Sequence, residues 1–180
     1  MVDAIRTVKV PEGINVDVTR TEIKIKGPKA ELTRQYPYQY VNIQKKDSDI
    51  TIAPSKNTAK LKAVVGSFAA HINNMIRGVQ EPFIYKLKIC SSHFPMTVKI
   101  QGNEVQVVNF LGEKKPRKAN ISPEVKVKVE GDIITVEGND IELAGQTAAK
   151  IEQLTRITKR DRRIFQDGVY IIEKAGKSLI

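Results

Sequence analysis

The strongest constraint on the fold is an internal duplication. Residues 49–52 (Asp-Ile-Thr-Ile) match 133–136 (Ile-Ile-Thr-Val), and residues 66–72 (Gly-Ser-Phe-Ala-Ala-His-Ile) match 145–151 (Gly-Gln-Thr-Ala-Ala-Lys-Ile). The offset is 84 positions in the first match and 79 in the second, which predicts a loop five residues longer in the first copy, around residues 55–60. One repeat at this spacing predicts a small domain made twice, not a solenoid of many short units.

Both copies show the same order of hydrophobic periods. Alternating apolar residues predict short antiparallel strands, for example at Val8/Val10, Ile14/Val16/Val18, Ile23/Ile25 and Ile50/Ile52, and again at Leu87/Ile89, Val105/Val107, Val125/Val127/Val129 and Ile134/Val136. Apolar spacings of three and four then predict a helix from Leu61 to near Gly78, and a second helix that starts with a capping box at Asn139 and Glu142. Each copy should therefore pack its helix against its own sheet.

These patterns predict an α+β protein of two tandem copies of a small domain, each an antiparallel β-sheet packed on one α-helix, plus a C-terminal basic hairpin tail. The predicted domains are an N-terminal repeat over residues 1–81, a C-terminal repeat over 82–157 and a tail over 158–180. The connection between the repeats, residues 78–83, is short, so a fixed arrangement is expected.

Positive charge is in excess and clustered. The chain has 30 Lys and Arg against 20 Asp and Glu, a net charge of +10, which favours a polyanionic partner such as nucleic acid. The predicted RNA-contacting residues are Lys114, Lys115, Arg117 and Lys118 in a loop of the second copy, and Arg156, Lys159, Arg160, Arg162, Arg163 and Lys174 near the C-terminus. Lysines on an exposed loop can reach phosphates without disturbing a core, and arginines can bind phosphates through two hydrogen bonds at once.

The segment that carries the C-terminal cluster also has a turn signal. Asp167-Gly168 lies between two apolar stretches, which predicts a hairpin turn there. Phe165 and Tyr170 flank this turn and are suited either to base stacking or to packing within the protein, and packing is favoured.

The residues offer poor material for an enzyme or a metal centre. The chain has two histidines, His71 and His93, one cysteine, Cys90, and no glycine-rich phosphate loop. Two histidines do not make a closed zinc site, so no catalytic residue, metal site, cofactor or small-molecule substrate is predicted. No apolar run approaches the ~20 residues of a membrane span, and the N-terminus lacks an apolar leader, so a soluble, cytoplasmic protein without a membrane partner is expected.

The whole chain resembles the family of large-subunit ribosomal protein number six, in its archaeal and eukaryotic branch. The most specific element is the run from Gln153 to Lys174, Gln-x3-Ile-x2-Arg-x2-Arg-x-Phe-x-Asp-Gly-Val-Tyr-Ile-x2-Lys, which is similar to that branch's C-terminal signature at every specified position. The early Val10-Pro11-Glu12-Gly13-Ile14 and the duplicated domain are similar as well. The lysine- and glycine-rich C-terminal pattern of the bacterial branch is absent.

The resemblance implies a structural constituent of the large ribosomal subunit that binds large-subunit rRNA near the factor-binding region and the stalk base, by the sarcin-ricin loop, and supports translation. It implies neighbouring large-subunit ribosomal proteins as further partners, and the C-terminal copy and tail as the main RNA-contacting parts. Two other functions remain open at this point. One is a protein-interaction adaptor that recruits a partner protein through exposed sheet edges and the hairpin, with the charge serving only solubility. The other is an RNA-modifying enzyme, for which no acid/base or cofactor site is evident.

Overall fold

The computed structural model describes residues 5–46 and 49–179, and the chain forms two compact units, residues 1–82 and 83–180. The first boundary therefore falls one residue later than the predicted 81. Because of the duplication, each unit has a hydrophobic core of its own.

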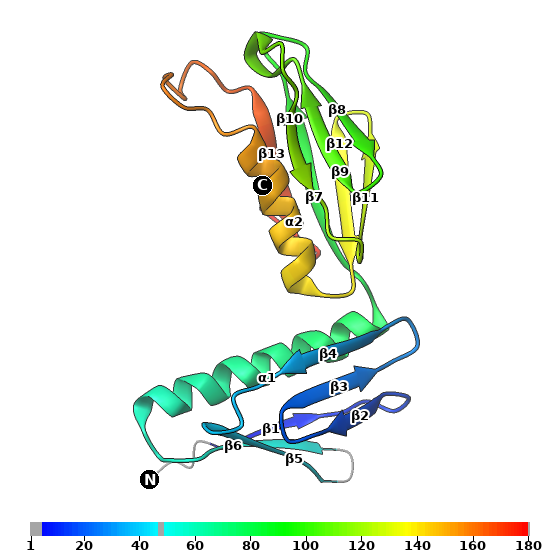
Figure 1. Ribbon diagram of the computed structural model, residues 1–180, viewed down its shortest axis with the longest axis vertical. Coiled ribbons are helices and arrows are strands. Elements are labelled where there is room, and N and C mark those ends of the chain that lie inside the picture. The colour runs from blue at the N-terminus through cyan, green and yellow to red at the C-terminus, as the bar shows by residue number, and fades with distance from the viewer. Residues whose placement is uncertain (1–4, 47–48, 180) are drawn as a thin grey trace. The chain divides into compact units, whose positions relative to one another are not determined.

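The described part of unit 1 forms two three-stranded antiparallel sheets and one helix (Figure 1). The first sheet has the order β1-β6-β5, with β1 at Arg6–Lys9, β6 at Asp49–Pro54 and β5 at Val41–Lys46. The second has the order β2-β3-β4, with β2 at Asn15–Val18, β3 at Glu22–Lys26 and β4 at Glu31–Gln35. Helix α1 spans Ala59–Gln80.

The core of unit 1 follows from the alternation of its strands. Ile23 and Ile25 on β3, and Ile50 and Ile52 on β6, are all fully buried, and they join α1 residues such as Ile72 in one apolar cluster. Successive strand residues point to opposite faces, so each pair of alternate isoleucines presents one apolar face to the helix. The predicted packing of a helix stripe on strands is therefore observed, with two sheets in place of one.

Unit 2 repeats this plan with a larger sheet (Figure 1). A three-stranded sheet has the order β10-β9-β8, with β10 at Arg117–Asn120, β9 at Glu104–Val108 and β8 at Thr97–Gln101. A five-stranded sheet has the order β11-β12-β7-β13-β14, with β11 at Val125–Glu130, β12 at Ile133–Gly138, β7 at Phe83–Cys90, β13 at Gly168–Lys174 and β14 at Lys177–Ser178. Helix α2 spans Ile141–Leu154, and a short 3-10 turn, η1, spans Phe110–Gly112.

The helix boundaries differ slightly from those predicted. α1 does not end near Gly78, which is buried within the helix, but continues to Gln80. α2 is capped by Asp140, whose side chain accepts a hydrogen bond from the backbone N–H of Glu142 at 2.8 Å, so the cap lies one residue after the predicted Asn139. The five extra residues of the first copy are shared between a longer connection before α1 and an earlier start of that helix.

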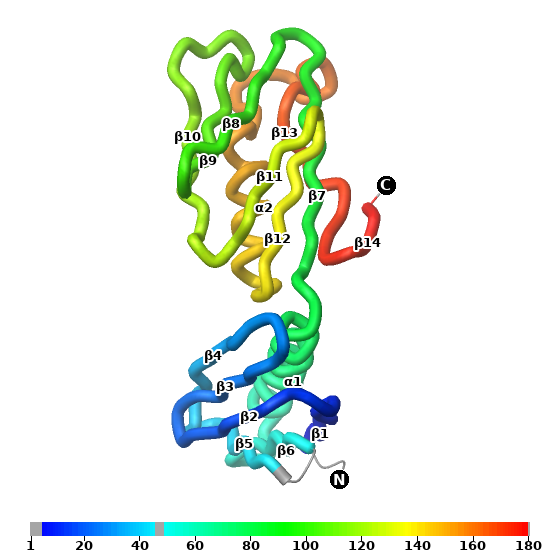
Figure 2. Tube along the Cα trace, turned by 90° about the vertical axis from the view of Figure 1, so that its right-hand side faces the viewer, coloured from blue at the N-terminus to red at the C-terminus, as the bar shows by residue number. Residues whose placement is uncertain are grey.

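The C-terminal segment is not an appended tail, which corrects the predicted division at residue 158. β13 pairs along its length with β7, and Val169 is fully buried, so residues 168–174 complete the sheet of unit 2. Figure 2 shows the short β14, in red, beyond β13 at the edge of this sheet. A C-terminal hairpin does exist between β13 and β14, but it turns at Ala175 and Gly176, both with positive φ.

Candidate nucleic-acid interface

Three loops of unit 2 lie together at one end of the unit, where β7 ends, where η1 leads into β10, and where the chain leaves α2 for β13 (Figures 1 and 2). The sheet order causes this meeting, because β13 runs antiparallel beside β7 and so begins where β7 ends. We call residues 156–163, which leave α2, the basic segment. Apart from Lys174, the two predicted clusters of positive charge thus lie at the same end of the unit.

Arg117 holds two of these loops together. Its Nε and one terminal nitrogen donate to the Glu113 carboxylate at 2.8 and 2.5 Å, and its other terminal nitrogen donates to the carbonyl oxygen of Leu154 at 2.7 Å. The guanidinium carbon also lies 4.4 Å from the centre of the Phe110 ring. A cation bound to the last carbonyl of a helix satisfies an otherwise unpaired acceptor and complements the helix dipole. Arg117, predicted to contact RNA, therefore has an internal structural role, and its hydrogen bonds lower the pKa of Glu113.

The lysines around Arg117 differ in whether they form an ion pair. Lys118 lies on β10, and its Nζ is 3.1 Å from a carboxylate oxygen of Glu104. Lys114 and Lys115 are exposed on the loop that Arg117 anchors, and within the described residues no ion pair engages either ammonium group. The anchored loop therefore presents these two charges to solvent next to the end of α2.

The basic segment is held by contacts of its own. The Arg160 guanidinium lies 4.7 Å from the centre of the Phe165 ring, and Phe165 packs against the core of unit 2, as favoured for this aromatic. Asp161 accepts from the backbone N–H of Arg163 at 2.9 Å and pairs with its guanidinium at 3.3 Å. Lys159 has a positive φ of 61° and is exposed. The segment is thus a compact loop with its cations outward.

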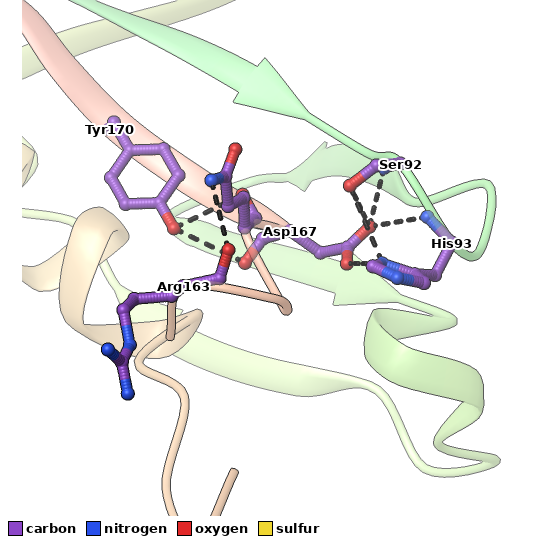
Figure 3. Close-up of polar contacts among 6 residues, drawn as sticks. Ser92, His93, Arg163, Asp167 and Tyr170 are labelled. Carbon is purple, nitrogen blue, oxygen red and sulfur yellow. Dashed lines mark hydrogen bonds and ion pairs between the residues drawn. The ribbon is translucent and has the colours of Figure 1, made fainter. Parts of the chain in front are cut away.

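Asp167 connects the start of β13 to the loop that follows β7 (Figure 3). One carboxylate oxygen accepts from the backbone N–H groups of Ser92 and His93 at 2.6 and 2.9 Å, and the other lies 2.6 Å from Nδ1 of His93. Burial acts to raise the pKa of Asp167, but the hydrogen bonds from His93 and Ser92 outweigh it and hold the value at about 2. The His93 ring stacks on Phe165 at 4.9 Å.

These contacts correct the predicted turn at Asp167 and Gly168. Asp167 is only 2% exposed and binds the loop after β7, while Gly168 begins β13 opposite Cys90. Gly168 has a φ of +156°, and a Cβ there would lie 3.2 Å from the Tyr170 ring. The glycine is therefore needed for close approach of a ring within a strand, and the aspartate is needed as an acceptor.

The end of α2 also fixes β13. The Thr155 hydroxyl accepts from the backbone N–H of Val169 at 2.8 Å, and a carboxylate oxygen of Glu152 accepts from the backbone N–H of Ile171 at 3.0 Å. These two side chains satisfy strand donors that face away from β7. No sequence pattern indicated this role, since neither residue belongs to a charge cluster or a turn motif.

A pocket of about 290 Å³ opens between the end of α2, the basic segment and β13. Arg156 and Arg162, both exposed, and Tyr170 are among its lining residues. Lys174, by contrast, is exposed near the opposite end of β13 beside Lys177, so the structure does not bring it to the other predicted contacts. The surface at the loop end of unit 2 is thus cationic, indented and held by hydrogen bonds from within.

No group of three or more His, Cys, Asp or Glu among the described residues is arranged to hold a metal ion. Likewise, neither helix in the described part of the chain is long and apolar enough to cross a membrane. His71 is half-buried on α1, with Nε2 at 3.4 Å from a guanidinium nitrogen of Arg34, and Cys90 is half-buried at the end of β7.

A comparison with known protein families finds the same duplication. The model of the family described as ribosomal protein L6 matches residues 10–82 and again 94–168, once in each unit. The chain belongs to the ribosomal protein L6 family. It is 45% identical over 170 residues to the large ribosomal subunit protein uL6 of Methanosarcina mazei, covering 94% of this chain and 97% of that protein.

Further members of the ribosomal protein L6 family are similar to this chain to about the same degree. The uL6 protein of Sulfurisphaera tokodaii is 46% identical, covering 93% of this chain and 90% of that protein, and that of Halobacterium salinarum is 42% identical, covering 94% and 96%. These archaeal relatives confirm the resemblance, and the two matches of the family model confirm the duplicated α+β fold. Ribosomal protein L6 is a structural protein family, so the chain is not an enzyme.

Proposed function

We propose that this chain is a structural constituent of the large ribosomal subunit that binds large-subunit rRNA near the factor-binding region and the stalk base, through the loop end of unit 2. The relatives are named as large-subunit proteins, which supports the proposal that this chain assembles into the large ribosomal subunit. The observation that carries the mode of binding is the meeting of the Lys114–Lys115 loop and the basic segment at one end of unit 2, anchored by Arg117.

The chemistry of this end suits structured RNA. Exposed Lys114, Lys115, Lys159 and Arg162 supply charge to phosphates, and arginine also stacks on bases. The internal contacts of Arg117 and Asp167 reduce the entropy lost when these loops bind, because the backbone is already ordered. Neighbouring large-subunit proteins are the other expected partners, and the cytoplasmic ribosome is the expected location.

Two measurements test this function. Purified protein should bind an rRNA fragment of the factor-binding region at least about tenfold more tightly than unrelated RNA of the same length, with affinity falling steeply as salt rises. Equal, salt-independent binding to both RNAs contradicts the proposal. In sedimentation, release of the chain from large subunits after RNase treatment supports RNA as the partner, whereas retention on a protein partner supports the adaptor function.

A further inference from the structure

The pocket at the end of α2 has a floor and a rim of different chemistry. Its floor is formed by buried Thr155, Ile157 and Val169, which are 4%, 8% and 0% exposed. Its rim carries the exposed side chains of Arg156 and Arg162. A base that combines Thr155 with apolar Ile157 and Val169, under a cationic mouth, fits a ligand that is flat at one end and anionic at the other.

The walls of the pocket are fixed by hydrogen bonds within unit 2. The Thr155 hydroxyl donates to the carbonyl of Glu152 at 3.1 Å and accepts from the Val169 backbone N–H. The Tyr170 hydroxyl donates to the carbonyl of Gln166 at 3.2 Å, which holds the ring beside the residues just before β13 (Figure 3). Burial raises the pKa of Tyr170, and the charge of Arg162, which also lines the pocket, opposes that rise.

The size and the charges discriminate between ligands. About 290 Å³ admits one flat heterocycle but not a double helix. Glu152 also lines the pocket, and the negative charge of its carboxylate disfavours a bare phosphate inside it. That carboxylate instead suits a base with an exocyclic amino group, and adenine, cytosine and guanine each carry one. RNA-binding proteins commonly place splayed-out bases on aromatic and arginine side chains.

We infer that this pocket takes the base of one unpaired ribonucleotide, with Tyr170 along the base and with Arg156 and Arg162 on the flanking phosphates. The inference rests on the proposed function and deepens it, because it assigns a single-base site within the RNA-binding end of unit 2. Lys114 and Lys115 then contribute sequence-independent affinity, and the pocket contributes the requirement for an unpaired base.

The test fills the pocket without changing charge. Gln153 is exposed and lines the pocket, so Gln153→Phe places a ring in its mouth. Gln146 lies seven residues earlier on α2, is also exposed and is not among the lining residues, so Gln146→Phe is the matched control. Gln153→Ala widens the mouth and controls for loss of the amide. Circular dichroism melting of each variant checks that unit 2 remains folded.

The assay is chemical footprinting of large-subunit rRNA bound by the full chain. Base-specific modification should show one or a few unpaired nucleotides protected by wild type, Gln146→Phe and Gln153→Ala but not by Gln153→Phe, while hydroxyl-radical protection of the backbone stays the same. Affinity of Gln153→Phe should fall about tenfold, as expected for loss of one stacked base.

The two proposals fail in different ways. If folded Gln153→Phe protects the same bases as wild type, the base site is wrong, while rRNA binding near the factor region stands. If wild type binds the factor-region fragment no better than unrelated RNA, the proposed function fails and the base site fails with it. Protection confined to paired nucleotides also overturns the base site.

Discussion

Replacing Asp167 with asparagine should weaken unit 2 in a way that depends on pH. The Asp167 carboxylate is 2% exposed and accepts four hydrogen bonds from the loop after β7. Two come from backbone N–H groups, one from the Ser92 hydroxyl and one from the His93 ring. The amide of the asparagine variant keeps one acceptor oxygen but loses the negative charge. The loop end of unit 2 therefore stays connected, with weaker bonds.

The magnitude follows from the pKa of Asp167, which is about 2 in the folded protein against an ordinary 3.8. A shift of that size corresponds to about 2 kcal/mol of folding free energy. Because the folded pKa lies below the unfolded one, this stability is present above the ordinary pKa and is lost as pH falls toward 2. The asparagine variant has no such titration. The gap in unfolding free energy between wild type and Asp167→Asn should thus be about 2 kcal/mol at about pH 5 and close to zero at about pH 2.

The assay is urea unfolding at several pH values, followed by the NMR signal of the Val169 amide, which is buried in β13 and reports on unit 2 alone. Glu104, Glu113 and Asp161 also have lowered pKa values, but they titrate in both proteins and cancel in the difference. Asp161→Asn is the control, since that carboxylate is exposed and should give a far smaller gap. A gap that stays constant across this acidic range would refute the account of Asp167.

Three further outcomes are expected. Arg117→Lys should lower the unfolding free energy of unit 2 by about 2 kcal/mol, because lysine cannot bind Glu113 and the end of α2 together; an unchanged denaturation midpoint would contradict this. Gly168→Ala should cost roughly 1–2 kcal/mol, and less in a Tyr170→Leu background, because the added Cβ meets the tyrosine ring; an equal cost in both backgrounds would rule out that contact. Arg162→Gln with Arg163→Gln should reduce the slope of log affinity against log salt by about 1–2 without lowering the melting temperature, and an unchanged slope would remove both from the RNA surface.

The local patterns of the sequence predicted the elements well, because burial imposes their periods directly. Alternation at Ile23 and Ile25 marked a strand whose one face is buried, and spacings of three and four marked both helices. The duplication predicted that these elements would form two similar units, as they do. Charge clustering named residues for a polyanion surface, although it did not distinguish the Arg117 side chain from those of Lys114 and Lys115.

The sequence by itself thus determined the element order, the repeat and the family. Only the tertiary structure decided the roles of Arg117, Asp167 and Thr155. The partners of Asp167 lie 75 and 74 residues away in the chain, and those of Arg117 include a carbonyl 37 residues away. An Asp-Gly pair has a local preference for turns, but here the order β12-β7-β13 places it beside two backbone N–H groups just after β7, and satisfying those donors outweighs the turn.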